Sequence, residues 1–182
     1  HIRAVGGEWS WTKIAPTDGL LLNTKPLNLT FRISAASVSG NYAKTNDDRY
    51  FAQCGASVQE LSIALKRRGR SLRTSGASNG QTIAGAMSTG THGAAIDFGA
   101  ITECVVGLHI IVNPTRHVWL ERASYPVASD SFVSKLNAER ISDDELFNAA
   151  LVSFGSFGFI HGVMIETEPL FLYECHRVNL PF

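Results

Sequence analysis

The sequence predicts a domain of the α+β class, because strands and helices are mixed without the regular strand–helix–strand rhythm of a doubly wound parallel sheet. Two observations support this prediction. Apolar residues alternate with polar ones in several short runs, as half-buried strands require. Two separate segments carry the Ser-x-x-Glu pattern that begins a helix. A chain of 182 residues with 45% hydrophobic residues can also bury one substantial core.

Strands dominate the first 52 residues. Gly6-Gly7 follows the first strand directly, at a point where a backbone without Cβ atoms can turn tightly or approach a ligand. Thr17-Asp18-Gly19 is a turn signal before the second strand. The expected strands are Ile2 to Val5, Leu20 to Leu22, the alternating face of Leu27, Leu29, Phe31 and Ile33, and Tyr50 to Ala52.

Two capping boxes predict helices in the rest of the chain. The first box, Ser57-Val58-Gln59-Glu60, begins a helix that ends near Gly69. Its apolar face consists of Leu61, Ala64 and Leu65. The second box, Ser142-Asp143-Asp144-Glu145, places acidic residues at the positive end of its helix. The apolar residues of that helix are Leu146, Ala149 and Ala150.

Further strands are expected around and after these helices. Asn113 to Arg116 reads as a turn between two of them, and Pro169 separates the last two. The expected strands are Cys104 to Val112, His117 to Leu120, Phe159 to Glu168, and Phe171 to Val178.

Charge and cysteine content exclude several classes of protein. Sixteen basic residues balance sixteen acidic ones, so neither a nucleic acid nor an anionic membrane surface is an expected partner. No apolar run approaches the length of a membrane-spanning segment. Cys54, Cys104 and Cys175 are far apart and lie in apolar surroundings, which indicates buried free thiols and favours a reducing compartment such as the cytoplasm. The histidines lack metal-ligand spacing, so no metal site is expected.

Residues 75–93 form a glycine-rich segment that could carry chemistry. Glycines at five positions are interleaved with small residues and hydroxyls, which exposes backbone N–H groups to a bulky anionic or planar ligand. A flexible loop that only turns corners is the alternative. Neither the G-x-G-x-x-G pattern nor a P-loop pattern is present, so a bound dinucleotide would need another fold.

The order of three motifs resembles one family of flavoproteins. The first motif, Arg3 to Trp11 with Thr17-Asp18-Gly19 after it, is followed by the second motif, the run from Gly80 to Gly93, which ends in Thr-Gly-Thr-His-Gly. Phe154 to Ile160 adds a third, weaker signature. The chain resembles the FAD-binding domain of the vanillyl-alcohol oxidase type, the PCMH-type fold, nearest the aldonolactone oxidases, alditol oxidases and the covalent-flavin type of cholesterol oxidase.

The resemblance implies a two-lobed FAD-binding domain over residues 1–182. Residues 1–52 would form the first lobe, truncated at its N-terminus, and residues 53–182 the second. It further implies an oxidoreductase that oxidises an alcohol or lactone substrate, such as a sugar alcohol, an aldonolactone or a sterol, with oxygen or another electron acceptor. The separate substrate-binding cap domain of that family would be absent, so no catalytic residue is named and the fragment alone is expected to be inactive.

The same resemblance implies which residues contact FAD. The first loop, residues 6–10 of the first motif, would hold the pyrophosphate through backbone N–H groups. The second motif would pass along the ribityl chain and the isoalloxazine, and the third motif would meet the adenosine. The cofactor-binding residues expected in these three segments are Gly6, Gly7, Glu8, Trp9 and Ser10; Gly85, Ser88, Thr89, Gly90, Thr91, His92 and Gly93; and Gly158 and Ile160.

One departure from the family pattern lies in the first loop. Relatives that attach the flavin through this loop have Gly-His-Ser there, whereas this chain has Glu8-Trp9-Ser10. FAD is therefore expected to bind without a covalent bond to this loop, and Glu8 must turn away from the pyrophosphate. His92 could contact the flavin or simply bond a backbone carbonyl. Of the three tryptophans, only Trp9 has a loop position suited to stacking.

Two other classes stay open. A degenerate, non-catalytic flavin- or nucleotide-binding module would explain Glu8-Trp9 in the first loop. A plain interaction domain would use its glycines only to turn corners.

Overall fold

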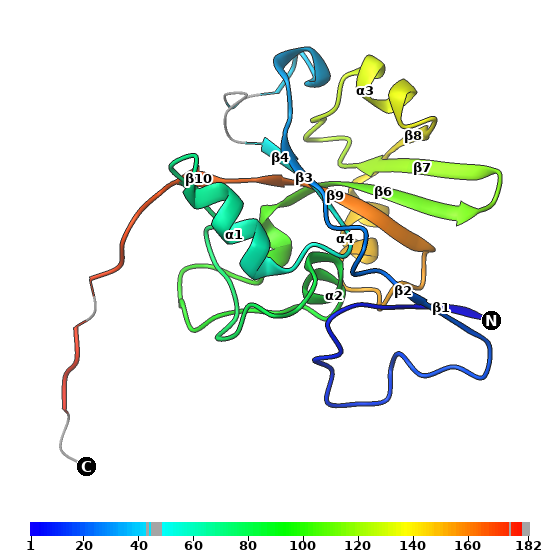
Figure 1. Cartoon of the computed structure of the whole chain (residues 1–182). Helices are drawn as coiled ribbons and strands as arrows, with labels where there is room; N and C mark the ends of the chain where they lie inside the picture. Colours follow the sequence, from blue (N-terminus) through cyan, green and yellow to red (C-terminus); the bar gives the residue numbers. More distant parts are fainter. Residues whose placement is uncertain (43, 45–48, 175, 180–182) are drawn as a thin grey trace.

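A mixed sheet of six strands forms the centre of the molecule. The computed structural model describes residues 1–42, 44, 49–174 and 176–179 (Figure 1). Neighbouring strands are antiparallel except β7 and β8, which pair in parallel. In spatial order the strands are β3 (Thr30–Arg32), β4 (Arg49–Gln53), β9 (Phe159–Glu166), β6 (Val105–Asn113), β7 (Arg116–Glu121) and β8 (Glu139–Ser142).

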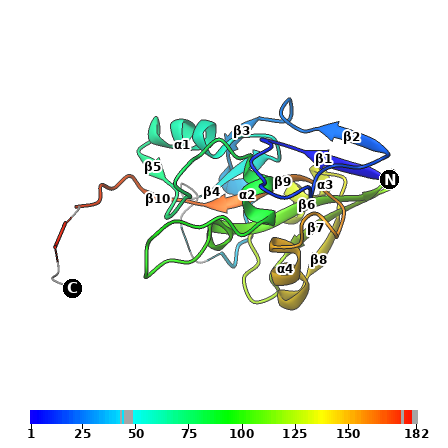
Figure 2. The same cartoon turned by 90° about the horizontal axis from the view of Figure 1, so that it is seen from below.

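Helices cover both faces of this sheet. One face packs against α1 (Val58–Lys66), α2 (Ile83–Ser88) and α4 (Asp144–Leu151), with the short 3-10 helix η3 (Ile101–Cys104) beside them. The opposite face packs against α3 (Asp130–Lys135) and the 3-10 helix η1 (Ala35–Ser37). Figure 2, in which the molecule is seen from below, shows α2 and α4 on the same side of the sheet. The α+β class predicted from the sequence is confirmed.

Two small sheets flank the central one. β1 (Ile2–Val5) and β2 (Leu20–Asn23) pair in parallel, and the first loop begins directly after β1. β5 (Arg70–Ser71) and β10 (Glu168–Pro169) pair in the antiparallel sense. The division into lobes at residues 52 and 53 stays a prediction, and β3 and β4 both belong to the six-stranded sheet.

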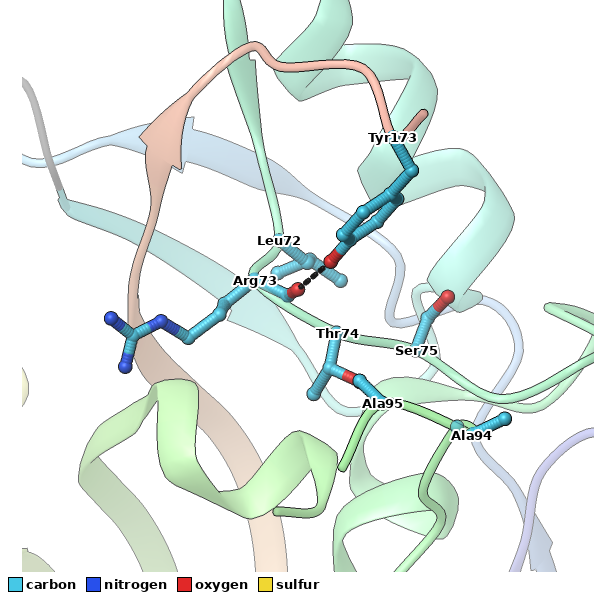
Figure 3. Close-up of a pocket in the computed structure, with 8 residues that line it drawn as sticks. Leu72, Arg73, Thr74, Ser75, Ala94, Ala95 and Tyr173 are labelled. Atoms are coloured by element: carbon cyan, nitrogen blue, oxygen red, sulfur yellow. Dashed lines mark hydrogen bonds between the residues drawn. The ribbon is translucent and has the colours of Figure 1, made fainter. Parts of the chain in front are cut away.

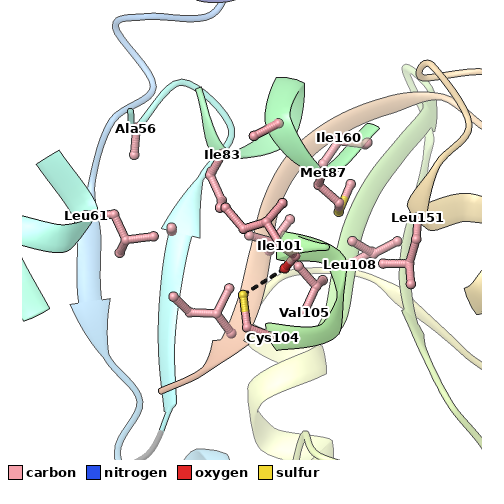
Figure 4. Packing of buried hydrophobic residues seen from close by; sticks show 14 of the residues in the cluster. Ala56, Leu61, Ile83, Met87, Ile101, Cys104, Val105, Leu108, Leu151 and Ile160 are labelled. Atoms are coloured by element: carbon pink, nitrogen blue, oxygen red, sulfur yellow. Dashed lines mark hydrogen bonds between the residues drawn. The ribbon is translucent and has the colours of Figure 1, made fainter. Parts of the chain in front are cut away.

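The alternation of side chains along the strands separates two cores. Tyr50 and Ala52 of β4 face α1 and α2, whereas Phe51 between them faces α3. The larger core, part of which Figure 4 shows around Met87 and Leu108, packs against the buried side of α2. Because α2 carries the second motif, the packing of this core fixes where that motif lies.

The first capping box behaves as predicted. The hydroxyl of Ser57 accepts the N–H of Glu60 at 3.1 Å, and the carboxylate of Glu60 accepts the N–H of Ser57 at 2.8 Å. Leu61 and Leu65 are fully buried. The chain leaves the helix at Gly69, whose φ of +69° suits a residue without a Cβ atom.

The second box was placed one residue too early. Asp143, not Ser142, caps α4, because its carboxylate accepts the N–H of Leu146 at 2.8 Å while Ser142 still pairs in β8. The predicted apolar face also shifts. Ala150 is buried as predicted and Leu146 packs against the core, but Ala149 is exposed, and Phe147 and Leu151 are buried in addition.

Two strand predictions were wrong in part or in whole. β3 contains three residues and forms an edge of the sheet, and of the expected face Leu29 and Phe31 are exposed while only Ile33 is fully buried. The expected strand from Phe171 to Val178 is absent among its described residues, which are exposed and have no strand to pair with.

The described cysteines agree with the prediction of free thiols. Cys54 and Cys104 are buried and unpaired, and burial raises the pKa of the Cys54 thiol to about 11 and that of Cys104 to about 12. Cys175 lies outside the described residues.

Three histidines meet on the α3 side of the sheet. Nδ1 of His109 and Nδ1 of His161 lie 2.9 Å apart, and the rings of His109 and His117 are 5.7 Å apart. Burial and the two neighbouring imidazoles lower the pKa of His109 to about 4, and burial and His117 also lower the pKa of His161. The folded protein therefore disfavours charge on His109 and His161.

We expect folding to weaken on acidification because of this cluster. A base whose folded pKa lies below its unfolded value of 6.5 takes up protons first in the unfolded state. Stability is therefore fully present above pH 6.5 and is lost as the pH falls toward 4. For His109 alone the loss is on the order of 3 kcal/mol. Urea unfolding midpoints measured across this pH range give the slope of stability against pH.

Two variants separate the cluster from other titrating groups. His109→Gln removes the buried base and should flatten the slope. His176→Gln changes a histidine that is largely exposed and should keep it. Equal slopes in the wild type and His109→Gln would contradict the assignment.

Candidate functional site

The first loop lies directly on the start of the second motif. A Cβ atom added at Gly6 would overlap Oγ1 of Thr82, and one added at Gly7 would lie 2.8 Å from the carbonyl oxygen of Gly80. Gly80 in turn has no room for a Cβ atom because the indole of Trp9 occupies that space. Segments about seventy residues apart in the sequence are thus in contact.

Thr82 joins this contact to α2. Its side chain accepts the N–H of Gly85 at 3.3 Å and so caps the helix, while its methyl and hydroxyl face Gly6. The backbone N–H of Ile83 donates to the carbonyl of Ala56 at 2.7 Å, which ties the start of α2 to the loop before α1. The position of the first loop therefore depends on the same side chain that begins α2.

The turn after α2 packs against the early part of the glycine-rich segment. A Cβ atom added at Gly93 would lie 2.5 Å from the carbonyl oxygen of Ser75, and one added at Gly76 would lie 2.9 Å from Cγ2 of Thr91. We expected Gly93 to be glycine so that FAD could approach. The structure gives another reason, since the protein's own backbone fills that space.

The third motif meets the opposite end of α2. The N–H of Phe154 donates to the carbonyl of Ser88 at 3.3 Å. Gly90 has a φ of +67° and faces the side chain of Val152. The C-terminal end of α2 is therefore the point where the second and third motifs join.

The expected residues are not all equally placed to bind a ligand. Gly158, with a φ of +138°, lies against the backbone of Ile111, and the side chain of Ile160 packs in the larger core. Ile160 can therefore offer a ligand little more than its backbone. Thr89 is exposed, but its hydroxyl donates to the carbonyl of Gly85 at 2.9 Å.

His92 is exposed and bonds its own loop. Its Nδ1 lies 2.9 Å from the carbonyl oxygen of Gly93, which matches the simpler of the two interpretations of this residue. Glu8 is also exposed, and its φ of +60° is uncommon for a residue with a side chain. The strained backbone at Glu8 turns the first loop between Gly7 and Trp9.

The first loop offers unused donors to an anion. Within the described part of the chain, the backbone N–H groups of residues 6–10 donate to no other protein group. A doubly charged pyrophosphate needs several convergent donors when it leaves water. The N–H groups of residues 6–10 are available to such an anion.

Two residues that sequence reasoning missed add acceptors nearby. Oδ1 of Asn79 and Oε1 of Gln81 are buried and have no hydrogen-bond partner among the described residues. An unpaired buried acceptor is costly unless a ligand or water donates to it. Both residues lie between glycines of the segment 75–93, and an amide side chain in such a segment was the available signal.

A shallow cavity of about 210 Å³ adjoins the turn at Gly93 (Figure 3). Residues 72–75 and 93–95 form its walls, and Tyr173 closes one side by donating its hydroxyl to the carbonyl of Arg73 at 3.2 Å. Too small for a whole dinucleotide, the cavity extends the surface next to the second motif.

The described residues contain neither a candidate metal site nor a candidate membrane span. In that part of the chain, no cluster of three His, Cys, Asp or Glu side chains is arranged to hold a metal ion. Nor is any helix there long and apolar enough to cross a membrane.

The fold and the three joined motifs define a flavin-binding domain. The family model described as FAD binding domain matches residues 1–120, and the chain belongs to this family. The PCMH-type resemblance inferred from the motifs is thereby confirmed.

The names of the relatives include an alcohol oxidase and a lactone dehydrogenase. The chain is 32% identical over 178 residues to a long-chain alcohol oxidase of an uncultured marine euryarchaeote, covering 97% of this chain and 31% of the relative. It is 26% identical over 176 residues to an L-gulono-1,4-lactone dehydrogenase of Mycobacterium tuberculosis, covering 97% and 34%. The chain thus spans about a third of the length of these relatives.

A solved structure has the same fold. Cholesterol oxidase from B. sterolicum matches with a TM-score of 0.64 at 20% identity, over 92% of this chain and 30% of that one. At this identity the likeness shows the fold.

Alanine at Gly93 tests whether the turn depends on glycine for packing. We expect Gly93→Ala to lower stability by about 1 to 3 kcal/mol, because the new methyl group meets the backbone of Ser75. The same variant should lose bound flavin, since the turn after α2 must move. Thermal unfolding and flavin absorbance measure the two effects.

Gly40→Ala is the matched control. Nothing lies within 4 Å of a Cβ atom at Gly40, so this variant should keep both its stability and its flavin. Wild-type behaviour of Gly93→Ala would show that the loops are not packed in this way.

Proposed function

We propose that the protein carrying this chain is an FAD-dependent oxidoreductase that oxidises an alcohol or lactone substrate. The free N–H groups of residues 6–10, next to the second motif, are the observation that carries the cofactor assignment. The names of the relatives support oxidation of CH–OH groups, since they include an alcohol oxidase and a lactone dehydrogenase.

The residues of this chain would bind and orient the cofactor. The N–H groups of Gly6 to Ser10 would hold the pyrophosphate, with the side chain of Glu8 turned to solvent. Ser88 to Gly93, after Gly85, would pass along the ribityl chain and the isoalloxazine, and Gly158 and Ile160 would meet the adenosine. Bound FAD would supply the acceptor for a hydride from the substrate carbon.

The substrate and the electron acceptor are proposed only by class. A sugar alcohol, an aldonolactone or a sterol is the proposed substrate, and oxygen or another acceptor would reoxidise the flavin. We assign no side chain of this chain to proton transfer. Residues 1–52 and 53–182 are proposed to flank the cofactor as two lobes.

A non-catalytic flavin-binding module is the second candidate. Glu8 favours it, because a carboxylate in a pyrophosphate loop opposes an anionic ligand unless it stays in solvent. Such a module would bind FAD without reducing it.

Anaerobic reduction separates these two functions. The native protein is purified with its flavin and mixed, without oxygen, with a long-chain alcohol, an aldonolactone, an alditol or a sterol. Loss of flavin absorbance near 450 nm, on the order of full bleaching, with one substrate class supports the enzyme. A yellow protein that no substrate bleaches supports the module, and a colourless one contradicts both.

We expect the flavin to be released by acid. The indole of Trp9 has no basic nitrogen to join the ring methyl, and Nδ1 of His92 already bonds Gly93. After acid precipitation of the native protein, the yellow colour should stay in the supernatant.

His92→Ala serves as the control, because its flavin should be as extractable as that of the wild type. A yellow pellet whose flavin maps to a peptide containing residues 6–11 would contradict the prediction. A yellow pellet that turns colourless only in His92→Ala would place the bond at His92.

A further inference from the structure

A cationic surface lies where α1 ends. Between Glu60 and Asp97 the chain contains five basic residues and no acidic one. Lys66, Arg67 and Arg68 form a basic triplet, and all three side chains are exposed. The balance of sixteen basic and sixteen acidic residues, from which we expected no anionic partner, averages over this local excess of positive charge.

The two other arginines of this segment are held by the protein itself. Arg70 donates from Nη2 to the carbonyl of Thr167 at 2.7 Å, and Nε of Arg73 lies 3.7 Å from the carboxylate of Glu168. Among the described residues, by contrast, no acidic side chain forms an ion pair with the basic triplet. The charge of the triplet is therefore not neutralised within the described part of the chain.

Backbone hydrogen bonds hold the basic triplet at the edge of the molecule. The N–H of Gly69 donates to the carbonyl of Lys66 at 3.0 Å, and the N–H of Leu170 donates to the carbonyl of Gly69 at 2.7 Å. A Cβ atom added at Gly69 would meet nothing within 4 Å, so this turn protrudes into solvent. Figures 1 and 2 show α1 and β10 together, on the other side of the molecule from β1 and the first loop.

Exposed apolar side chains adjoin the basic triplet. Ile63, one helical turn before Arg67, leaves 47% of its surface exposed, although the other large apolar residues of α1 are buried. Leu170, which bonds Gly69 directly after the triplet, leaves 46% exposed. Cations beside exposed apolar residues are typical of surfaces that lie on an anionic bilayer. A nucleic acid backbone would use the cations and leave the apolar side chains in water.

The helix dipole alone does not explain three consecutive cations. A basic residue in the last turn of a helix stabilises it through the partial negative charge at that end, and Lys66 already has this position. Arg67 and Arg68 place like charges beside it, and their mutual repulsion opposes the folded arrangement. An anionic partner would relieve this repulsion.

We propose that the basic triplet, with Ile63 and Leu170, is a peripheral binding surface for an anionic phospholipid membrane. The surface would lie on the bilayer without crossing it. Each cation near an anionic bilayer strengthens binding about fivefold, so the triplet contributes on the order of a hundredfold. Charges in water interact over only about 10 Å at about 0.1 M salt, so added salt should weaken the binding.

Co-sedimentation of the native protein with lipid vesicles tests the proposal. At low salt the wild type should bind vesicles that contain about one-third phosphatidylserine, and should not bind vesicles of phosphatidylcholine alone. Lys66→Gln, Arg67→Gln and Arg68→Gln, introduced together, should weaken this binding on the order of a hundredfold. Ile63→Ser should weaken it about threefold to tenfold without a change of charge.

Lys13→Gln, Lys25→Gln and Lys135→Gln, introduced together, are the matched control. They remove the same total charge from exposed positions elsewhere, so this variant should bind vesicles as the wild type does. Far-UV circular dichroism confirms that each variant is folded.

Three results would overturn the proposal: equal weakening by the two triple variants, unchanged binding of Ile63→Ser, and a wild type that binds neither kind of vesicle. In the last case, binding of a duplex oligonucleotide that the basic-triplet variant loses would assign the surface to nucleic acid instead.

Discussion

Close contacts at glycines, where neighbouring backbone and side-chain atoms fill the space of a Cβ atom, hold the candidate site together. At Gly6, Gly7 and Gly80 a Cβ atom would overlap a neighbouring loop, and at Gly93 it would press on the carbonyl of Ser75. Protein interiors are close-packed, so a single added methyl group must displace its neighbours. The first loop, the glycine-rich segment and the turn after α2 therefore form one unit, positioned by Thr82 and by the core beneath α2.

This packing leaves polar groups of the loops unused. The N–H groups of residues 6–10 point to no protein acceptor in the described chain, and the side-chain oxygens of Asn79 and Gln81 are buried without donors there. Such groups carry a cost unless a ligand or water completes them. In our proposal, FAD bound at this place would complete them.

Local rules predicted much of the fold, and long-range contacts account for most of what they missed. The Ser57 capping box depends on four consecutive residues, so the sequence alone was sufficient. Leu29 and Phe31 alternate as in a covered strand, but whether a strand lies at a sheet edge depends on its partners. The contact of Trp9 with Gly80 joins distant segments and has no local signal, so sequence reasoning did not predict it.

Hydrogen exchange at the first loop tests most directly whether its free N–H groups bind the cofactor. Amide exchange of residues 6–10 is measured by mass spectrometry in the native apoprotein, with and without saturating FAD. We predict marked slowing in this segment, while residues 130–135 of α3, on the far face of the sheet, exchange as before. Unchanged exchange at residues 6–10 with FAD demonstrably bound would contradict the assignment of the first loop.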